Sequence, residues 1–191
     1  MCIRDRPNTL TEIGYSAFDG TTALTTITIP KTVTTAGNNV FNGSALKTAT
    51  IENGATAVAD NLFSNAKNLT KVTIPNTVKK VGSMSFYGCT KLSSVTLPNT
   101  LTEIGYSAFN GTTALTTITI PKTVTKAGID VFEDSGLKTA TIENGATAVA
   151  DNLFSNAKNL KMCIRDSYYY NYAGCHLFAW HIRHWRLCVC I

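Results

Sequence analysis

The sequence predicts a β-rich solenoid in which coils of 22 or 23 residues stack to form one parallel sheet, with short helical turns between the strands. Three observations predict it. Phenylalanines recur at spacings of 22 or 23 residues, leucines follow the same period, and each leucine precedes a short β-branched segment. A unit of this length cannot bury its own apolar face, so neighbouring units must stack and place equivalent strands side by side.

The strand of each coil is marked by apolar residues that alternate with threonines. In the segment 24–30, Ile27 and Ile29 alternate with Thr26 and Thr28, a pattern typical of a strand with one buried face. Pro30 then ends the strand, because a proline cannot donate to a ladder. The deeper core is expected to hold a phenylalanine ladder, formed by Phe18, Phe41, Phe63, Phe86, Phe109, Phe132 and Phe154.

The turns of each coil carry glycines. Gly14 and Gly20 are typical of turns that need a small residue or a positive φ, and the residues between them are too few for more than one helical turn. Two coils depart from this pattern and are expected to turn differently. The departures replace the proline by glutamate and the glycine by alanine, at Glu52, Glu143, Ala59 and Ala150.

A longer duplication contains the short repeat. Residues 7–69 match residues 98–160 at an offset of 91, and 56 of the 63 positions are identical. A duplication this close is either recent or copied in error. The seven differing pairs are 19/110, 35/126, 38/129, 39/130, 42/133, 43/134 and 45/136.

Three phrases of the repeat are specific: T-I-T-I-P-K-T-V-T, L-T-E-I-G-Y-S-A-F and S-F-Y-G-C-T-K-L. They resemble the BspA-like, or treponemal-type, leucine-rich repeat, and the resemblance covers residues 7–161. It implies a leucine-rich-repeat solenoid of the α/β repeat class, extracellular or attached to a cell surface. It also implies a non-catalytic module for adhesion, with a protein or glycan of a host or neighbouring cell as partner.

The two ends of the chain differ in composition from the repeats. Residues 7–161 hold every lysine and no Arg, His or Trp, all of which lie in residues 1–6 and 162–191. The strings MCIRDR and MCIRDS, at residues 1–6 and 162–167, fit one nucleotide string read in frame and resemble a translated sequencing adapter. We therefore expect residues 1–6 to be an artefact, residues 7–161 to form about seven coils, and residues 162–191 to be an adapter followed by an unrelated tail.

The tail holds a cluster of potential metal ligands, Cys175, His176, His181, His184, Cys188 and Cys190. Adjacent Cys-His and C-x-C do not have the usual C-x2-C spacing of zinc sites, so no metal site is predicted. Trp180 and Trp185 beside arginines are interpreted in the same way, as an accidental cluster. No run of 18 apolar residues exists, so no membrane-spanning helix is predicted.

The repeats lack the residues that most enzymes need. They contain no histidine, no G-x-S-x-G motif and no phosphate-binding glycine loop, and a nucleophilic Ser or Thr requires an activating base. Cys89, the single cysteine of residues 7–161, is interpreted as a small residue packed behind the turn at Phe86. Neither catalytic residues nor a cofactor are therefore predicted.

The exposed side of the strands is the candidate binding face. Alternation places two columns of mostly hydroxyl side chains there: Thr26, Thr28, Thr48, Thr50, Lys71, Thr73, Ser94, Thr96, Thr117, Thr119, Thr139 and Thr141. Threonine also simply suits an exposed strand, and cross-strand pairs add stability. Solenoid faces commonly bind partners, so protein or glycan binding is the functional interpretation. A structural stalk with no specific ligand is the alternative. Ice binding through the threonine columns is a remote alternative, because Lys71 interrupts one column.

The charge balance gives few indications about partners. The formal net charge of +5 is too small to predict nucleic-acid binding without a clustered patch. Uncapped strand edges recruit further strands, so self-association through the ends of residues 7–161 is expected.

Overall fold

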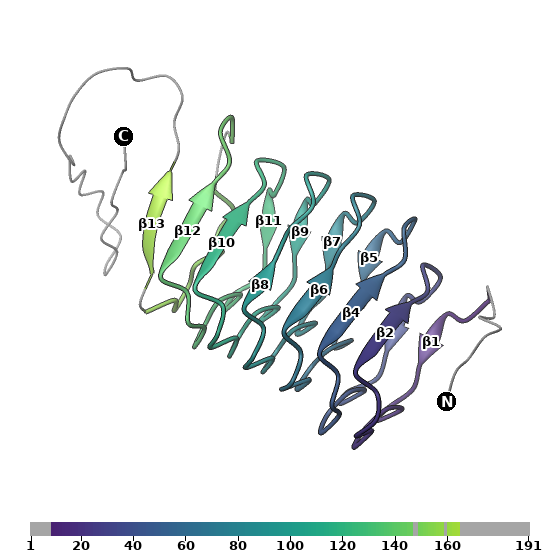
Figure 1. Ribbon diagram of the computed structural model, residues 1–191. Helices are drawn as coiled ribbons and strands as arrows, with labels where there is room; N and C mark the ends of the chain where they lie inside the picture. Colours follow the sequence, from purple (N-terminus) through teal and green to yellow (C-terminus); the bar gives the residue numbers. More distant parts are fainter. Residues whose placement is uncertain (1–8, 147–148, 159, 165–191) are drawn as a thin grey trace, which may run out of the picture.

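The computed structural model describes residues 9–146, 149–158 and 160–164 (Figure 1). Within these ranges the protein is a parallel β-solenoid with no helix, which confirms the predicted architecture. Successive coils place strands on two flanks of the rod, which we call the long-strand flank and the short-strand flank.

The long-strand flank carries the predicted strands, all paired in parallel. Its first sheet holds β2 (Thr26–Ile29), β4 (Thr48–Ile51), β6 (Lys71–Thr73) and β8 (Ser94–Val95). Its second sheet holds β10 (Thr117–Ile120), β12 (Thr139–Ile142) and β13 (Lys161–Ile164). The predicted sheet is therefore present, and it divides between β8 and β10.

The short-strand flank lies where the sequence predicts turns. It holds β1 (Glu12–Ile13), which pairs with β3 (Thr35–Ala36). Its second sheet has the order β11-β9-β7-β5 and holds β5 (Ala57–Val58), β7 (Lys80–Val81), β9 (Glu103–Ile104) and β11 (Lys126–Ala127). Strands of two residues are too short to produce a visible alternation, which explains why the pattern did not reveal them.

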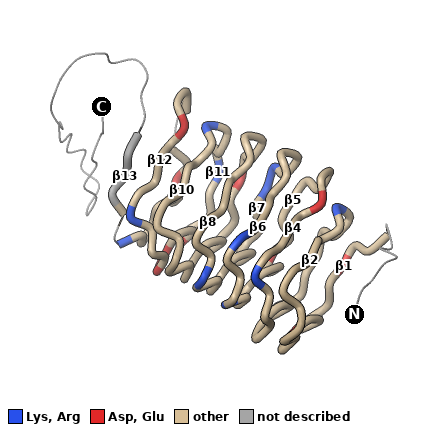
Figure 2. The backbone as a smooth tube through the Cα atoms, viewed as in Figure 1, with Lys and Arg blue, Asp and Glu red and all other residues tan. Residues whose placement is uncertain are grey.

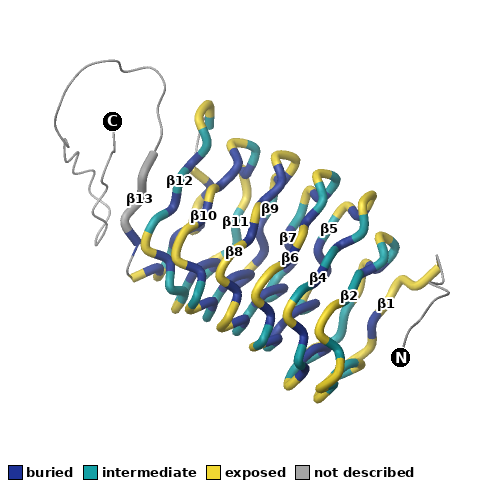
Figure 3. Tube along the Cα trace, viewed as in Figure 1, coloured by how far each residue is buried: buried dark blue, intermediate teal, exposed yellow. Residues whose placement is uncertain are grey.

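The apolar ladders fill the space between the flanks, as the alternation of buried and exposed segments shows (Figure 3). The phenylalanines stack ring on ring along the rod. The rings of Phe86 and Phe109 lie 5.1 Å apart and within 11° of parallel, which confirms their predicted stacking. The widest spacings, 5.6 and 5.7 Å, belong to Phe41–Phe63 and Phe132–Phe154. The ladder therefore loosens where the repeat spacing is 22 rather than 23 residues.

The turns beside the phenylalanines are left-handed bends instead of the expected helical turns. Met84 (φ 52°) and Gly88 (φ 67°) flank Phe86 in one coil, and other coils repeat the arrangement. These bends aim alternate amides at the next coil, where Phe86 N donates to Ala108 O at 2.9 Å. A third hydrogen-bonded ladder thus joins the coils, in addition to the two flanks.

Glycine at the end of the short strands lets neighbouring coils approach closely. A Cβ atom on Gly105 would lie 2.5 Å from Ser83 N, and one on Gly128 would lie 2.4 Å from Tyr106 N. Because there is no Cβ, Gly105 N donates to Val81 O at 2.8 Å. These positions require glycine because another coil's backbone occupies the space, whatever the local φ.

Ala59 stands where other coils have this glycine, and the junction before it is open. β3 does not pair with β5, and no amide of residues 38–43 donates to a carbonyl of residues 60–65, all of which are described. The methyl group explains this, since a Cβ at the equivalent glycines would clash with the preceding backbone. Side-chain bonds still cross the junction, among them those from Asn65 Nδ2 to Asn39 Oδ1 at 3.1 Å and from Asn68 Nδ2 to Ser44 O at 2.8 Å.

The glutamates that replace proline hold the preceding turn. Glu52 Oε2 accepts a hydrogen bond from Lys31 N at 3.0 Å, and Glu143 Oε2 accepts one from Lys122 N at 3.2 Å. Each carboxylate therefore satisfies an amide of the preceding coil. The two departures expected to change the turns act differently: the alanine separates coils, whereas the glutamate joins them.

The strand β13 joins the sheet one residue out of phase with the repeat. A spacing of 23 residues, as between Leu137 and Leu160, would place Met162 opposite Thr139. The register instead pairs β12 with β13 as Thr139↔Lys161, Ala140↔Met162, Thr141↔Cys163 and Ile142↔Ile164. A shift of one residue exchanges the two faces of a strand, so the apolar Met162 and Ile164 take the register positions of buried residues.

Strand pairing extends three residues past residue 161, the predicted boundary of the solenoid, which stays a prediction. Backbone pairing with β12 continues through Ile164, because a strand edge accepts any extended segment whose alternation suits it. The repeat phase is nevertheless broken there. Residues 1–8 and 165–191 lie outside the described residues, so the adapter interpretation and the unrelated tail stay predictions.

Candidate binding surface

The candidate face forms two columns along the long-strand flank. One column runs in register across β2, β4, β6 and β8 and consists of Thr26, Thr48, Lys71 and Ser94. In the second sheet Thr117 pairs with Thr139 and Thr119 with Thr141. The remaining members are Thr28, Thr50 and Thr73, which pair in register, and Thr96, which directly follows β8. The structure thus brings the predicted residues together on one flank, in two groups.

The hydroxyls of this face are free of intramolecular hydrogen bonds, within the part of the chain that the structure describes. Several threonines at other exposed positions differ, because their hydroxyls bind the backbone of the preceding coil. Thr70 Oγ1 donates to Lys47 O at 3.0 Å, and Thr102 Oγ1 donates to Lys79 O at 3.1 Å. Threonine therefore has two roles in this solenoid: it joins coils beside the strands and presents unpaired hydroxyls on the face.

The charges near the face have one sign. Lys47 directly precedes β4, Lys71 opens β6 and Lys138 directly precedes β12; all three are exposed and make no ion pair with a described residue. Figure 2 shows the corresponding blue segments at the starting ends of these strands. Two lysines elsewhere form ion pairs with described residues, Lys158 with Asp134 and Lys80 with Glu103, and the pKa of Lys80 is raised by its hydrogen bond to Glu103 at 3.0 Å.

Sequence reasoning missed Lys47 and Lys138 as parts of this surface. The signal was present, because the position before the strand carries a hydroxyl in four coils and lysine in these two. The hydroxyl residues at that position are Thr25, Thr70, Ser93 and Thr116.

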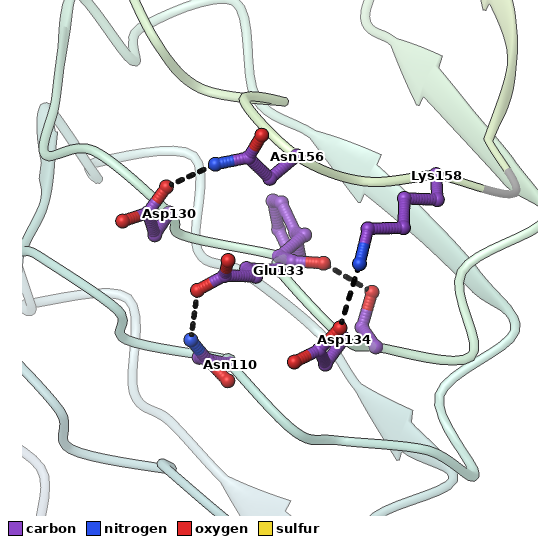
Figure 4. Close-up of polar contacts among 8 residues, drawn as sticks. Asn110, Asp130, Glu133, Asp134, Asn156 and Lys158 are labelled. Carbon is purple, nitrogen blue, oxygen red and sulfur yellow. Dashed lines mark hydrogen bonds and ion pairs between the residues drawn. The ribbon is translucent and has the colours of Figure 1, made fainter.

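The polar residues of the turns bind one another. In the second copy Asn110 Nδ2 donates to Glu133 Oε2 at 2.8 Å, and Asn156 Nδ2 donates to Asp130 Oδ1 at 2.9 Å (Figure 4). Asp134 pairs with Lys158 at 3.5 Å. These acids are engaged in joining coils, so they do not form a free acidic site.

Cys89 lies where the sequence placed it, fully buried beside the phenylalanine ladder. Its Sγ donates to Phe63 O at 3.1 Å, and burial raises the pKa of the thiol. The described residues include no group of three metal-ligating side chains. The Cys and His cluster of the tail lies outside the described residues. Nor does any helix in the described ranges have the length and hydropathy to span a bilayer.

Comparison with known families now adds to this geometry. A model of the BspA-type leucine-rich repeat region matches six copies, over residues 5–78 and 56–173. The chain belongs to this family. Members of the BspA-type family are surface-associated repeat modules that bind other molecules. No curated protein matches the sequence significantly.

Solved structures show the same fold. The leucine-rich repeat protein of T. pallidum aligns with a TM-score of 0.62 at 16% identity, covering 82% of this chain and 75% of that one. The pneumococcal vaccine antigen PcpA aligns with a TM-score of 0.54 at 18% identity, covering 83% of this chain and 55% of that one. A leucine-rich repeat protein from Bacteroides ovatus gives 0.50 at 26% identity, covering 84% and 48%. This chain thus spans about half the length of the last two.

Proposed function

We propose that this BspA-type solenoid is a non-catalytic binding module that engages a protein or glycan of another cell through its threonine face. The observation that carries the proposal is the row of hydroxyls that make no intramolecular bond, whereas several threonines elsewhere bind the backbone of the preceding coil. A hydroxyl that binds no other group can donate to and accept from a partner. Repetition along the rod lets weak contacts add through avidity.

The test replaces exposed threonines by a bulky residue that still favours a strand. Thr73→Tyr with Thr119→Tyr alters the face, and Thr56→Tyr with Thr125→Tyr is the matched control on the short-strand flank. Binding of the labelled full chain to epithelial cells, bacterial cells and immobilised glycans is measured by flow cytometry and surface plasmon resonance. We expect the face variant to lose about tenfold in affinity, near 1.4 kcal/mol, and the control to retain it.

Two results of this experiment would contradict the proposed binding module. If the wild-type chain is retained on none of these surfaces, or if both variants lose binding equally, the threonine face has no specific ligand. The stalk interpretation would then replace the binding module. Circular dichroism of each variant shows whether the fold is intact.

A further inference from the structure

The long-strand flank has a chemical composition that selects among partners. Of the residues in and directly before its strands from 24 to 142, none is acidic, whereas Lys47, Lys71 and Lys138 are exposed and unpaired. The acids of the neighbouring turns are engaged: Glu52 and Glu143 bind backbone amides. The flank therefore presents free hydroxyls and cations together.

The flank lacks the groups on which other partners depend. Large exposed apolar side chains in the described residues are Leu10, Tyr15, Tyr106, Ile129 and Val149, and none belongs to a strand of this flank. Protein interfaces usually place aromatic or arginine anchors at their centre. Single-stranded nucleic acids are bound by stacking their bases on aromatic residues. Neither kind of anchor is present here.

From this we propose that the flank binds an acidic polysaccharide, a ligand class that rests on the proposed function and makes it specific. Sulfate or carboxylate groups of such a chain pair with Lys47, Lys71 and Lys138, and its hydroxyls exchange hydrogen bonds with the threonine columns. Lys47 and Lys71 act together, because Lys71 is the register partner of Thr48, the residue next to Lys47. An extended polymer can reach all three lysines along the rod, so its contacts add.

The test uses dextran sulfate, neutral dextran of the same length and a single-stranded oligonucleotide as probes of the full chain. The variant Lys47→Thr/Lys71→Thr/Lys138→Thr removes three charges and introduces the hydroxyl that other coils carry at these positions. The control Lys67→Thr/Lys79→Thr/Lys126→Thr removes three exposed charges elsewhere. Fluorescence anisotropy at low and high salt gives Kd for each pair, and thermal melts confirm folding.

We expect dextran sulfate to bind, neutral dextran to bind at least about tenfold more weakly, and salt to weaken the complex. The face variant should lose about tenfold in affinity for dextran sulfate, and the control less than about twofold. Equal binding of both dextrans, equal losses in both variants, or equally tight binding of the oligonucleotide would overturn the proposal. Failure here, together with cell binding that Thr73→Tyr/Thr119→Tyr abolishes, would leave the binding module intact and reject only its acidic ligand.

Discussion

Two junctions between coils show how much depends on one methyl group. At Gly105 the coil lies directly against the one before it, so short strands pair, turn amides bond and the phenylalanine rings stack 5.1 Å apart beyond it. At Ala59 the short strands do not pair, the turn ladder stops and the rings are 5.6 Å apart. The long strands pair across both junctions, β2 with β4 and β6 with β8. Glycine therefore determines whether neighbouring coils pair on the short-strand flank, but the coils stack through their long strands in either case.

The alanine junction also shows how a solenoid tolerates such a gap. Where backbone bonds are absent, the side chain of Asn65 reaches back to Asn39. The second copy repeats the device with Asn156 and Asp130, although residue 39 is asparagine and residue 130 is aspartate. The acceptor oxygen is retained while its charge changes, because only an acceptor is needed.

The largest effect is expected from the phenylalanine ladder. Phe86→Ala removes a fully buried ring that stacks on both neighbours, and should lower the free energy of unfolding by about 3–5 kcal/mol. Phe41→Ala, at the open junction, should cost less by up to about 1 kcal/mol because one of its stacking contacts is wider and tilted by 21°. Urea denaturation measures both. Equal losses would show that the open junction packs as tightly as the closed ones.

Adding a methyl group at a closed junction should open it. Gly105→Ala places a Cβ atom against the backbone of Ser83, so we expect a loss of about 1–3 kcal/mol and faster amide exchange at Gly105. Ala59→Gly is the reverse change, and should slow exchange of the amides of residues 39–43. Unchanged exchange in both variants would show that the methyl group does not cause the gap.

Removing a turn-holding glutamate should have a smaller effect. Glu52→Ala leaves Lys31 N without its acceptor, in a turn that solvent reaches, so the expected loss is about 0.5–1.5 kcal/mol. Glu143→Ala should lose a similar amount, because Glu143 makes the same contact with Lys122 N. Glu133→Ala is a useful comparison, since its carboxylate binds a side chain rather than the backbone. A melting temperature unchanged in Glu52→Ala would contradict the role.

The smallest effect concerns a pair that differs between the two copies. Asn42 Nδ2 donates to Asp19 Oδ1 at 3.2 Å, and in the second copy Asn110 donates to Glu133 instead, with donor and acceptor exchanged. Asn110→Asp alone should place two carboxylates together and lose about 0.5 kcal/mol. Adding Glu133→Asn should restore the bond of the first copy and recover the loss. A double-mutant cycle measures this coupling, and strictly additive losses would contradict it.

That exchange also bears on the duplication. Positions 19/110 and 42/133 are two of the seven that differ, and they touch each other in both copies. Errors of copying would not select contacting positions or preserve their hydrogen bond. The two copies therefore carry matched changes, which favours a genuine duplication.

Most of the architecture could be predicted because the same residue pattern recurs in coil after coil. The phenylalanine and leucine periods, the alternation of residues 24–30 and the buried role of Cys89 each depend on local pattern and are confirmed. The short-strand flank could not be predicted, because two residues carry no alternation. The open junction at Ala59 could not be predicted either, because the clash involves the backbone of another coil.

The threonine face was predictable in position but not in chemistry. Alternation alone placed Thr28 and Thr50 outward, and their register confirms that they are neighbours. Whether a hydroxyl is free depends on whether a carbonyl of the preceding coil lies within reach. Thr70 donates to Lys47 O, whereas the Thr73 hydroxyl makes no such bond, although the sequence pattern predicts that both are exposed. The proposed role of Lys47 in ligand binding likewise depends on the structure, because the nearby acids Glu52 and Glu143 bind backbone amides.

The open junction at Ala59 also has a mechanical consequence. A rod anchored at one end and loaded at the other yields where fewest bonds resist, and the Ala59 junction retains the pairing of β2 with β4 but lacks two of the three backbone ladders. Under shear we therefore expect the rod to flex at this junction and at the equivalent one before Ala150, while the glycine junctions between them remain stiff. A module that bends at set positions can follow a moving ligand without unfolding its coils.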